Sequence, residues 1–208
     1  MNLNYARRFF LVMLLLAVFP AQGDDFDSAL TEPRNIFLQA VDGDKRAVRI
    51  AANRFRSLNL SNPKDPVFLA YYGASITLKG RDAAKGIDKQ RLTEDGLGKI
   101  DRALKLLSDT NHYPSSRRLE TLLVAANSFI HIPSFFNRYE RGKRLLHEIL
   151  EHNEFNEMAA GFKAATYFTA ALVARGDDNE CRRFLELTVN TDPQGRDGQF
   201  ASALLEEL

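Results

Sequence analysis

The sequence predicts an all-α protein, an α-solenoid in which about eight to nine helices form a stack of antiparallel hairpins. Apolar residues after residue 27 recur at spacings of three and four, as in amphipathic helices, and no segment alternates as a half-buried strand does. Breaks rich in Gly, Pro, Asp and Asn follow every second helical segment, at intervals of about 39 to 48 residues. Helices joined by such short breaks pack as hairpins that stack in sequence.

Four helices are expected in the first half of the chain, over residues 27–41, 45–58, 66–79 and from Thr93 to about residue 110. Asp27-Ser28 predicts the first N-cap, and Pro33 is tolerated only near the first turn of a helix. The break at residues 62–66, with its two prolines, ends the second helix and begins the third, which Gly80 ends. Residues 81–93 are polar and are expected to form a loop or a short helix.

Five more helices are expected in the second half of the chain. Pro114, Pro133 and Pro193 mark breaks between them, and Arg175-Gly176-Asp177 predicts a tight turn. The predicted ranges are 115–130, 135–151, from Asn153 or Asn156 to 174, 178–189 and 199–206.

A family resemblance rests on residues 165–193. Two antiparallel helices there carry small and large apolar residues and close on Asp-Pro; the residues are Ala165, Phe168, Thr169, Leu172, Gly176, Asp177, Cys181, Leu185, Thr188 and Pro193. This stretch resembles one tetratricopeptide repeat. Weaker matches begin at Leu69 and Leu122, and the first of these is delayed by the insertion at 81–93. The resemblance implies an irregular right-handed solenoid, with Cys181 buried where the family usually has Ala.

The first 23 residues are expected to be a cleavable signal peptide, leaving residues 24–208 as a single helical-repeat domain. Arg7 and Arg8 precede eleven apolar residues, Phe9–Phe19, whereas a spanning helix needs roughly 20. Ala21-Gln22-Gly23 has the small-x-small pattern of a cleavage site, and no Cys lies nearby to carry a lipid. We expect a periplasmic or secreted protein, cleaved after about Gly23 and without a stable membrane anchor. The paired arginines leave general secretory and twin-arginine export both open.

The charge balance argues against nucleic acid as a partner. Removing Arg7 and Arg8 from 28 basic residues leaves 26 against 27 acidic residues, a formal charge of −1. Nucleic-acid binding depends on a strongly basic surface. Cys181 is the only cysteine, so it cannot form a disulfide within the chain; burial is the favoured interpretation, and an intermolecular disulfide or a reactive thiol is the alternative.

The sequence contains no recognisable catalytic, metal or cofactor motif. The four histidines, at 112, 131, 147 and 152, include no pair at the helical spacing of zinc ligands. There is no Gly-x-Ser-x-Gly elbow and no glycine-rich phosphate loop. We therefore expect a protein that is not an enzyme and has no cofactor.

Two groups of residues are candidates for partner binding. Tetratricopeptide-like stacks line a concave groove with the first helix of each hairpin, which implies that Glu120, Asn127, Lys163 and Thr166 face the groove. The second group follows Pro133, where adjacent phenylalanines cannot both face one core stripe; an exposed ring beside arginines would suit a carboxylate-bearing or aromatic partner. Its residues are Phe135, Phe136, Arg138 and Arg141. The alternative is a hairpin junction at which both rings pack.

The leading hypothesis is an exported protein that binds a protein or peptide partner in the cell envelope. The alternative is a small-molecule-binding or enzymatic helical domain whose site is dispersed in sequence, which a deep, closed pocket would distinguish. Self-association, with or without Cys181, is a third possibility.

Overall fold

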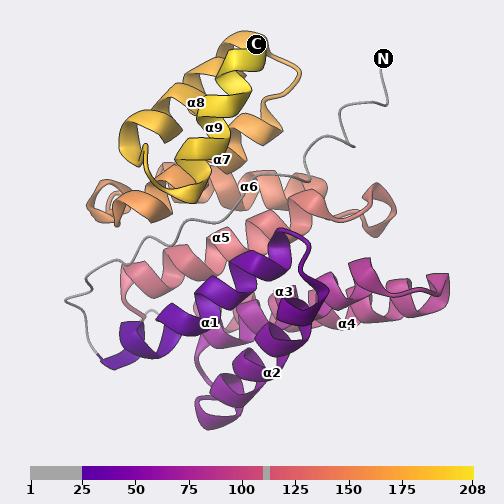
Figure 1. The fold of residues 1–208 in the computed structure, drawn as a ribbon. Helices are drawn as coiled ribbons and strands as arrows, with labels where there is room; N and C mark the ends of the chain where they lie inside the picture. The colour runs from indigo at the N-terminus through magenta and orange to yellow at the C-terminus, as the bar shows by residue number, and fades with distance from the viewer. Residues whose placement is uncertain (1–24, 110–112) are drawn as a thin grey trace.

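The computed structural model describes residues 25–109 and 113–208, and its secondary structure in these ranges is entirely helical (Figure 1). The predicted signal peptide lies outside the described residues. Eight helices pair as antiparallel hairpins, and α9 (Arg196–Glu207) packs against the last pair. The pairs are α1 (Asp25–Val41) with α2 (Lys45–Ser61), α3 (Pro66–Asp82) with α4 (Gly86–Asp109), α5 (Ser115–His131) with α6 (Tyr139–Leu150), and α7 (Ala160–Val173) with α8 (Asp178–Thr191).

The hairpins stack in sequence order, which confirms the predicted α-solenoid. Helix α3 packs against α2 on one side and α5 on the other, and α6 contacts α7. In Figure 1 the stack rises from the α1–α4 region at the bottom, through α5 and α6, to α7–α9 at the top. Helices α3 and α5 lie in the middle of the stack, and 11 of the 17 residues of α3 and 8 of the 17 residues of α5 are therefore buried.

Aspartate N-caps begin three of the helices at the predicted breaks. The Asp44 carboxylate accepts hydrogen bonds from the backbone N–H groups of Arg46 and Ala47 at the start of α2. Asp65 and Asp177 cap α3 and α8 in the same way. These side chains satisfy N–H groups that have no partner within the helix, so each break fixes the start of the next helix.

The segment 81–93 differs from the expected loop or short helix. Helix α3 continues to Asp82 and α4 already begins at Gly86, so only residues 83–85 connect them. The insertion therefore lengthens both helices of this hairpin, which Figure 1 shows projecting at the right. Exposed polar side chains conceal the helical pattern here, because few residues of the projecting end contact a core.

The starts of four helices also differ from the prediction. Pro33 does not lie near a first turn, because α1 begins at Asp25. The predicted helix 135–151 is divided into a 3-10 turn, Ser134–Phe136, and α6, since Asn137 adopts a left-handed conformation (φ 55°) that ends the turn. Helix α7 begins only at Ala160, after a second 3-10 turn at Phe155–Glu157, and α9 begins at Arg196 instead of residue 199.

Small residues set the distance between the two helices of a hairpin. A Cβ atom on Gly73 would lie 2.6 Å from the Gly96 carbonyl oxygen, and a Cβ on Gly96 would lie 2.6 Å from the Gly73 oxygen. The backbones of α3 and α4 therefore touch at these two glycines. Gly142 lets α6 approach α5 less closely, since its Cβ would lie 3.1 Å from the Ala126 carbonyl oxygen. Fully buried Phe55, Phe68 and Phe129 fill the spaces between hairpins.

Candidate functional site

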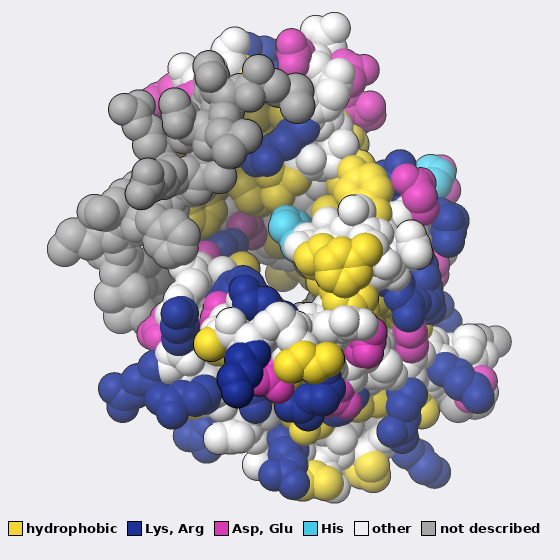
Figure 2. Space-filling view, turned by 90° about the vertical axis from the view of Figure 1, so that its right-hand side faces the viewer, with side chains coloured by type: hydrophobic (Ala, Val, Ile, Leu, Met, Phe, Trp, Pro, Cys, Tyr) yellow, Lys and Arg dark blue, Asp and Glu magenta, His cyan; other side chains and the backbone are white. Residues whose placement is uncertain are grey.

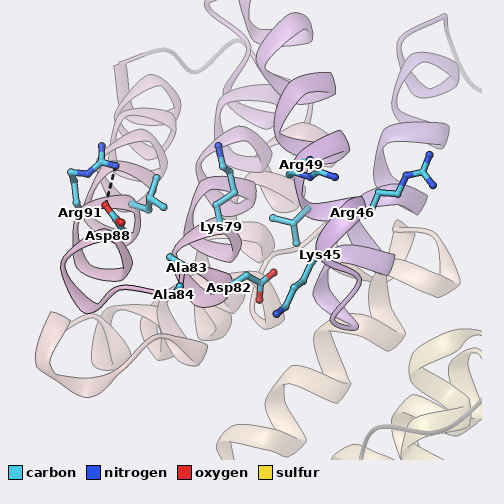
Figure 3. Close-up of a pocket in the computed structure, with 11 residues that line it drawn as sticks. Lys45, Arg46, Arg49, Lys79, Asp82, Ala83, Ala84, Asp88 and Arg91 are labelled. Carbon is cyan, nitrogen blue, oxygen red and sulfur yellow. Dashed lines mark ion pairs between the residues drawn. The ribbon is translucent and has the colours of Figure 1, made fainter.

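A cleft of about 660 Å³ opens between the start of α2 and the projecting end of the α3–α4 hairpin. Three helices contribute to it (Figure 3): α2 provides one wall, the last turn of α3 lies in the middle and the first turns of α4 provide the other wall. Basic residues predominate in the lining, beside two carboxylates and four apolar residues. The lining residues are Lys45, Arg46, Val48, Arg49, Lys79, Asp82, Ala83, Ala84, Asp88, Arg91 and Leu92.

The cleft carries an excess of positive charge. Among the described residues, Lys45, Arg46, Arg49 and Lys79 make no ion pair. Its two carboxylates are already engaged, because Arg81 contacts Asp82 at 2.8 Å and Arg91 contacts Asp88 at 3.5 Å. Lys45, Arg49 and Lys79 lie around the hollow in Figure 3, whereas the Arg46 side chain points away from it. The unpaired cations repel one another, and an anionic ligand would relieve that repulsion.

The turn between α1 and α2 holds the cleft cations in place. Gly43 has a φ of 105°, which only glycine adopts readily, and Asp44 caps α2 immediately before Lys45. From α3, Arg81 donates hydrogen bonds to the carbonyl oxygens of Ala40 (2.9 Å) and Val41 (3.1 Å) at the end of α1. The start of α2 is thereby fixed against the end of α3, so the cleft walls are preformed.

Charge is distributed unevenly over the chain. Residues 25–109 contain 15 basic and 12 acidic residues, whereas residues 113–208 contain 11 basic and 14 acidic residues. Figure 2 shows Lys and Arg concentrated on the lower part of one face, at the height of α1–α4 in Figure 1. A local basic surface therefore exists in a chain whose overall charge is close to zero.

The structure places Glu120 in an internal network. Arg34 of α1 donates two hydrogen bonds to its carboxylate, each of 2.6 Å, and the Tyr71 hydroxyl of α3 donates a third of 2.9 Å. Burial and the neighbouring Glu120 carboxylate raise the pKa of Tyr71 well above its ordinary value. This network ties together α1, α3 and α5, so Glu120 already has its partners within the protein.

The other residues predicted to line a groove are also engaged. Thr169 of α7 donates to the Asn127 side-chain oxygen at 2.9 Å, and Lys163 donates to the Asn156 carbonyl oxygen at 3.1 Å. Thr166 has no exposed surface and donates to the Phe162 carbonyl oxygen within its own helix. The expectation that Thr166 faces an open groove is therefore wrong: this position of α7 is turned into the hairpin stack.

The two phenylalanines after Pro133 differ in exposure. Phe135 is 67% exposed, while Phe136 packs against the core cluster of α3, α4 and α5, with the two ring centroids 4.4 Å apart. Arg138 and Arg141 share the Asp101 carboxylate of α4, at 2.8 Å and 2.5 Å. One aromatic side chain is thus exposed, and both arginines have an internal partner.

The cleft was missed from the sequence although a signal for it exists. Lys45 and Arg49 are four residues apart and share one side of α2. Lys79 and Arg91 reach them only because residues 81–93 extend two helices instead of forming a loop. If residues 81–93 are assigned to the ends of two helices, the sequence predicts that these cations lie near one another.

The described residues contain no group of three His, Cys, Asp or Glu side chains placed to hold a metal ion. Cys181 is buried, and burial raises the pKa of its thiol, which disfavours the reactive thiolate. This supports the buried interpretation of Cys181.

Comparison of the chain with protein-family models, curated proteins and solved structures found no match. Over the described ranges, no helix combines the length and apolar character needed to cross a membrane.

Proposed function

We propose that this protein is an exported helical-repeat module that binds an acidic segment of a protein partner in the cell envelope. The observation that carries the proposal is the α2–α3–α4 cleft, in which four cations have no ion-pair partner among the described residues and lie beside apolar residues. The signal-peptide pattern and the resemblance of residues 165–193 to a tetratricopeptide repeat support export and a binding role.

The shape of the cleft favours a chain over a compact anion. Its cations come from three helices and lie around an open surface, so a chain with several carboxylates can contact more of them than a single phosphate can. An extended or helical segment can place several carboxylates beside Lys45, Arg49 and Lys79 and apolar side chains over Ala84 and Leu92. Complementary charge of this kind gives specificity and fast association.

A charge-reversal experiment tests the proposal. Fluorescence anisotropy measures binding of a labelled peptide of mixed Glu and Leu to the purified protein. Arg49→Glu combined with Lys79→Glu should weaken binding about tenfold or more, because repulsion replaces attraction at two contacts. The matched control is Arg102→Glu with Arg144→Glu, two exposed positions outside the cleft lining that should leave affinity within about twofold, apart from weak long-range attraction.

Two results would contradict the proposal. Equal loss of affinity in the cleft and control variants would show non-specific attraction by net charge. Competition by millimolar inorganic phosphate at constant ionic strength would instead indicate a small-anion site, the dispersed small-molecule alternative. Circular dichroism of each variant establishes that it is folded.

A further inference from the structure

One ion pair joins the two ends of the solenoid. The Arg196 guanidinium, in the first turn of α9, contacts the Asp42 carboxylate in the turn between α1 and α2. These residues are 154 positions apart in the chain. The α5–α6 hairpin lies between the two regions in the stack (Figure 1).

Other contacts within their own ends of the stack hold both Arg196 and Asp42 in position. On α9, Asp197 contacts Arg196 at 2.7 Å and the Phe200 ring centroid lies 4.8 Å from its guanidinium carbon. In the first hairpin, Gly43, the Asp44 cap and the hydrogen bonds from Arg81 fix the turn that carries Asp42. Burial opposes the charge of Arg196, but hydrogen bonds and attraction from Asp42 and Asp197 raise its pKa, so it remains charged.

Few contacts join the two ends of the stack besides this ion pair. No extensive packing accompanies it, since α9 packs mainly on α7 and α8 and α1 mainly on α2. The Arg196 and Asp42 side chains are 31% and 45% exposed to solvent, so water and salt reach the pair. An ion pair of this exposure contributes little to global stability, but among the described residues α9 shares no extensive packing with α1 or α2 that would hold the two ends together without it.

We infer that Asp42 and Arg196 form a clasp that holds the curved stack closed and restricts access to its inner side. A bond between the two ends of an arc closes the arc on its concave side, and Figure 2 shows a hollow at mid-height, between the α1–α4 region and the α7–α9 region. A partner that enters this side has to separate Asp42 from Arg196. The clasp is distinct from the basic cleft, because Asp42 does not line the cleft.

Distance measurements between spin labels test the clasp. Labels are attached at Gln39→Cys and Ser202→Cys, two exposed positions on α1 and α9, in a Cys181→Ala background. Asp42→Asn and high salt should each raise the fraction of molecules with a long distance between the two labels about two- to fivefold. This is the change in population that corresponds to losing one exposed ion pair. Asp42→Arg combined with Arg196→Asp should restore the short distance.

Glu180→Gln is the matched control, because it removes the same charge from an exposed ion pair with Arg183 on α8, away from the clasp. This variant should keep the distance distribution of the parent protein. A distribution in Asp42→Asn that is identical to the parent at low salt would overturn the inference. So would equal opening in Glu180→Gln, which would show a general response to charge. Binding of the acidic peptide at the cleft is measured separately, so failure of either proposal leaves the other standing.

Discussion

Individual small residues determine how closely the helices of each hairpin approach. Gly73 and Gly96 allow backbone contact between α3 and α4, and Gly142 allows a close approach of α6 to α5. Glycine lowers intrinsic helix stability, so at these three positions its presence is explained by the close approach of helices that it allows. Other glycines in the same helix lack this role, as Gly98 shows: no atom of a neighbouring element lies within 4 Å of the position its Cβ would take.

Gly96 and Gly98 therefore provide a paired test. Gly96→Ala should lower the free energy of unfolding by about 1–3 kcal/mol, because the new methyl group overlaps the Gly73 carbonyl. Gly98→Ala should raise it by about 0.5–1 kcal/mol, because the helix gains propensity and loses no space. Urea unfolding followed by circular dichroism measures both. A stabilising Gly96→Ala substitution would show that the two backbones do not touch.

Asp65 gives a second test at this scale, through pH. Burial raises the pKa of Asp65, and attraction to Arg117 and its two backbone hydrogen bonds only partly oppose this. The folded state consequently binds a proton more tightly than the unfolded state, whose Asp pKa is about 4. The free energy of unfolding should then fall as pH rises from that value through the raised pKa.

Asp65→Asn is the comparison for this pH effect, because asparagine retains an oxygen for capping but cannot titrate. The unfolding free energy of the original protein minus that of Asp65→Asn should decrease with rising pH across the window. A difference that increases with pH would mean that the Arg117 ion pair outweighs burial and lowers the pKa of Asp65.

Helix lengths and docking positions decide which surfaces exist at the scale of elements. The longer α3 and α4 create the wall of the basic cleft. At the other end, α9 lies against the turn after α8, where a Cβ on Gly198 would overlap the Asp192 carbonyl oxygen. The Asp192 carboxylate also accepts a hydrogen bond from the Gly195 N–H at 3.0 Å. These contacts set the position from which α9 presents Arg196.

Gly198→Ala should therefore displace α9 without unfolding the hairpins. Hydrogen exchange measured by mass spectrometry should increase in residues 196–207 and change little in α3 and α5. Gly176→Ala is the control, because no atom lies within 4 Å of its Cβ position. Unchanged exchange in α9 would show that the Asp192 turn can shift to accept a side chain.

At the scale of the molecule, the hairpins form a curved stack whose ends meet at one ion pair. Stacked repeats contact mainly their neighbours in sequence, so most of their stability is local. The Arg34–Glu120–Tyr71 network and the Asp42–Arg196 pair are exceptions that join elements distant in the chain. The basic α1–α4 region and the more acidic α7–α9 region also give the molecule an asymmetric surface charge.

The candidate site was less predictable than the fold. The apolar residues that recur at helical spacing in α2 and α4 include Val48, Phe55, Ile100 and Leu107, all of which are buried. Sequence spacing shows which face of a helix a residue occupies but not which side chain contacts it there. Partner binding was therefore predicted for Glu120, Asn127 and Lys163. Their partners are 86, 42 and 7 residues away, so only packing of the helices reveals them.

The sequence by itself determined the all-α class and most of the hairpin breaks, and it favoured the burial of Cys181, because helical periodicity, Asp and Pro at helix starts and apolar spacing are local properties. Only the tertiary structure decided that residues 81–93 extend two helices, that Lys45, Arg49 and Lys79 surround one cleft, and that Asp42 meets Arg196. Each of these depends on contacts between segments far apart in the chain, and the energies of such contacts are not encoded in the spacing of neighbouring residues.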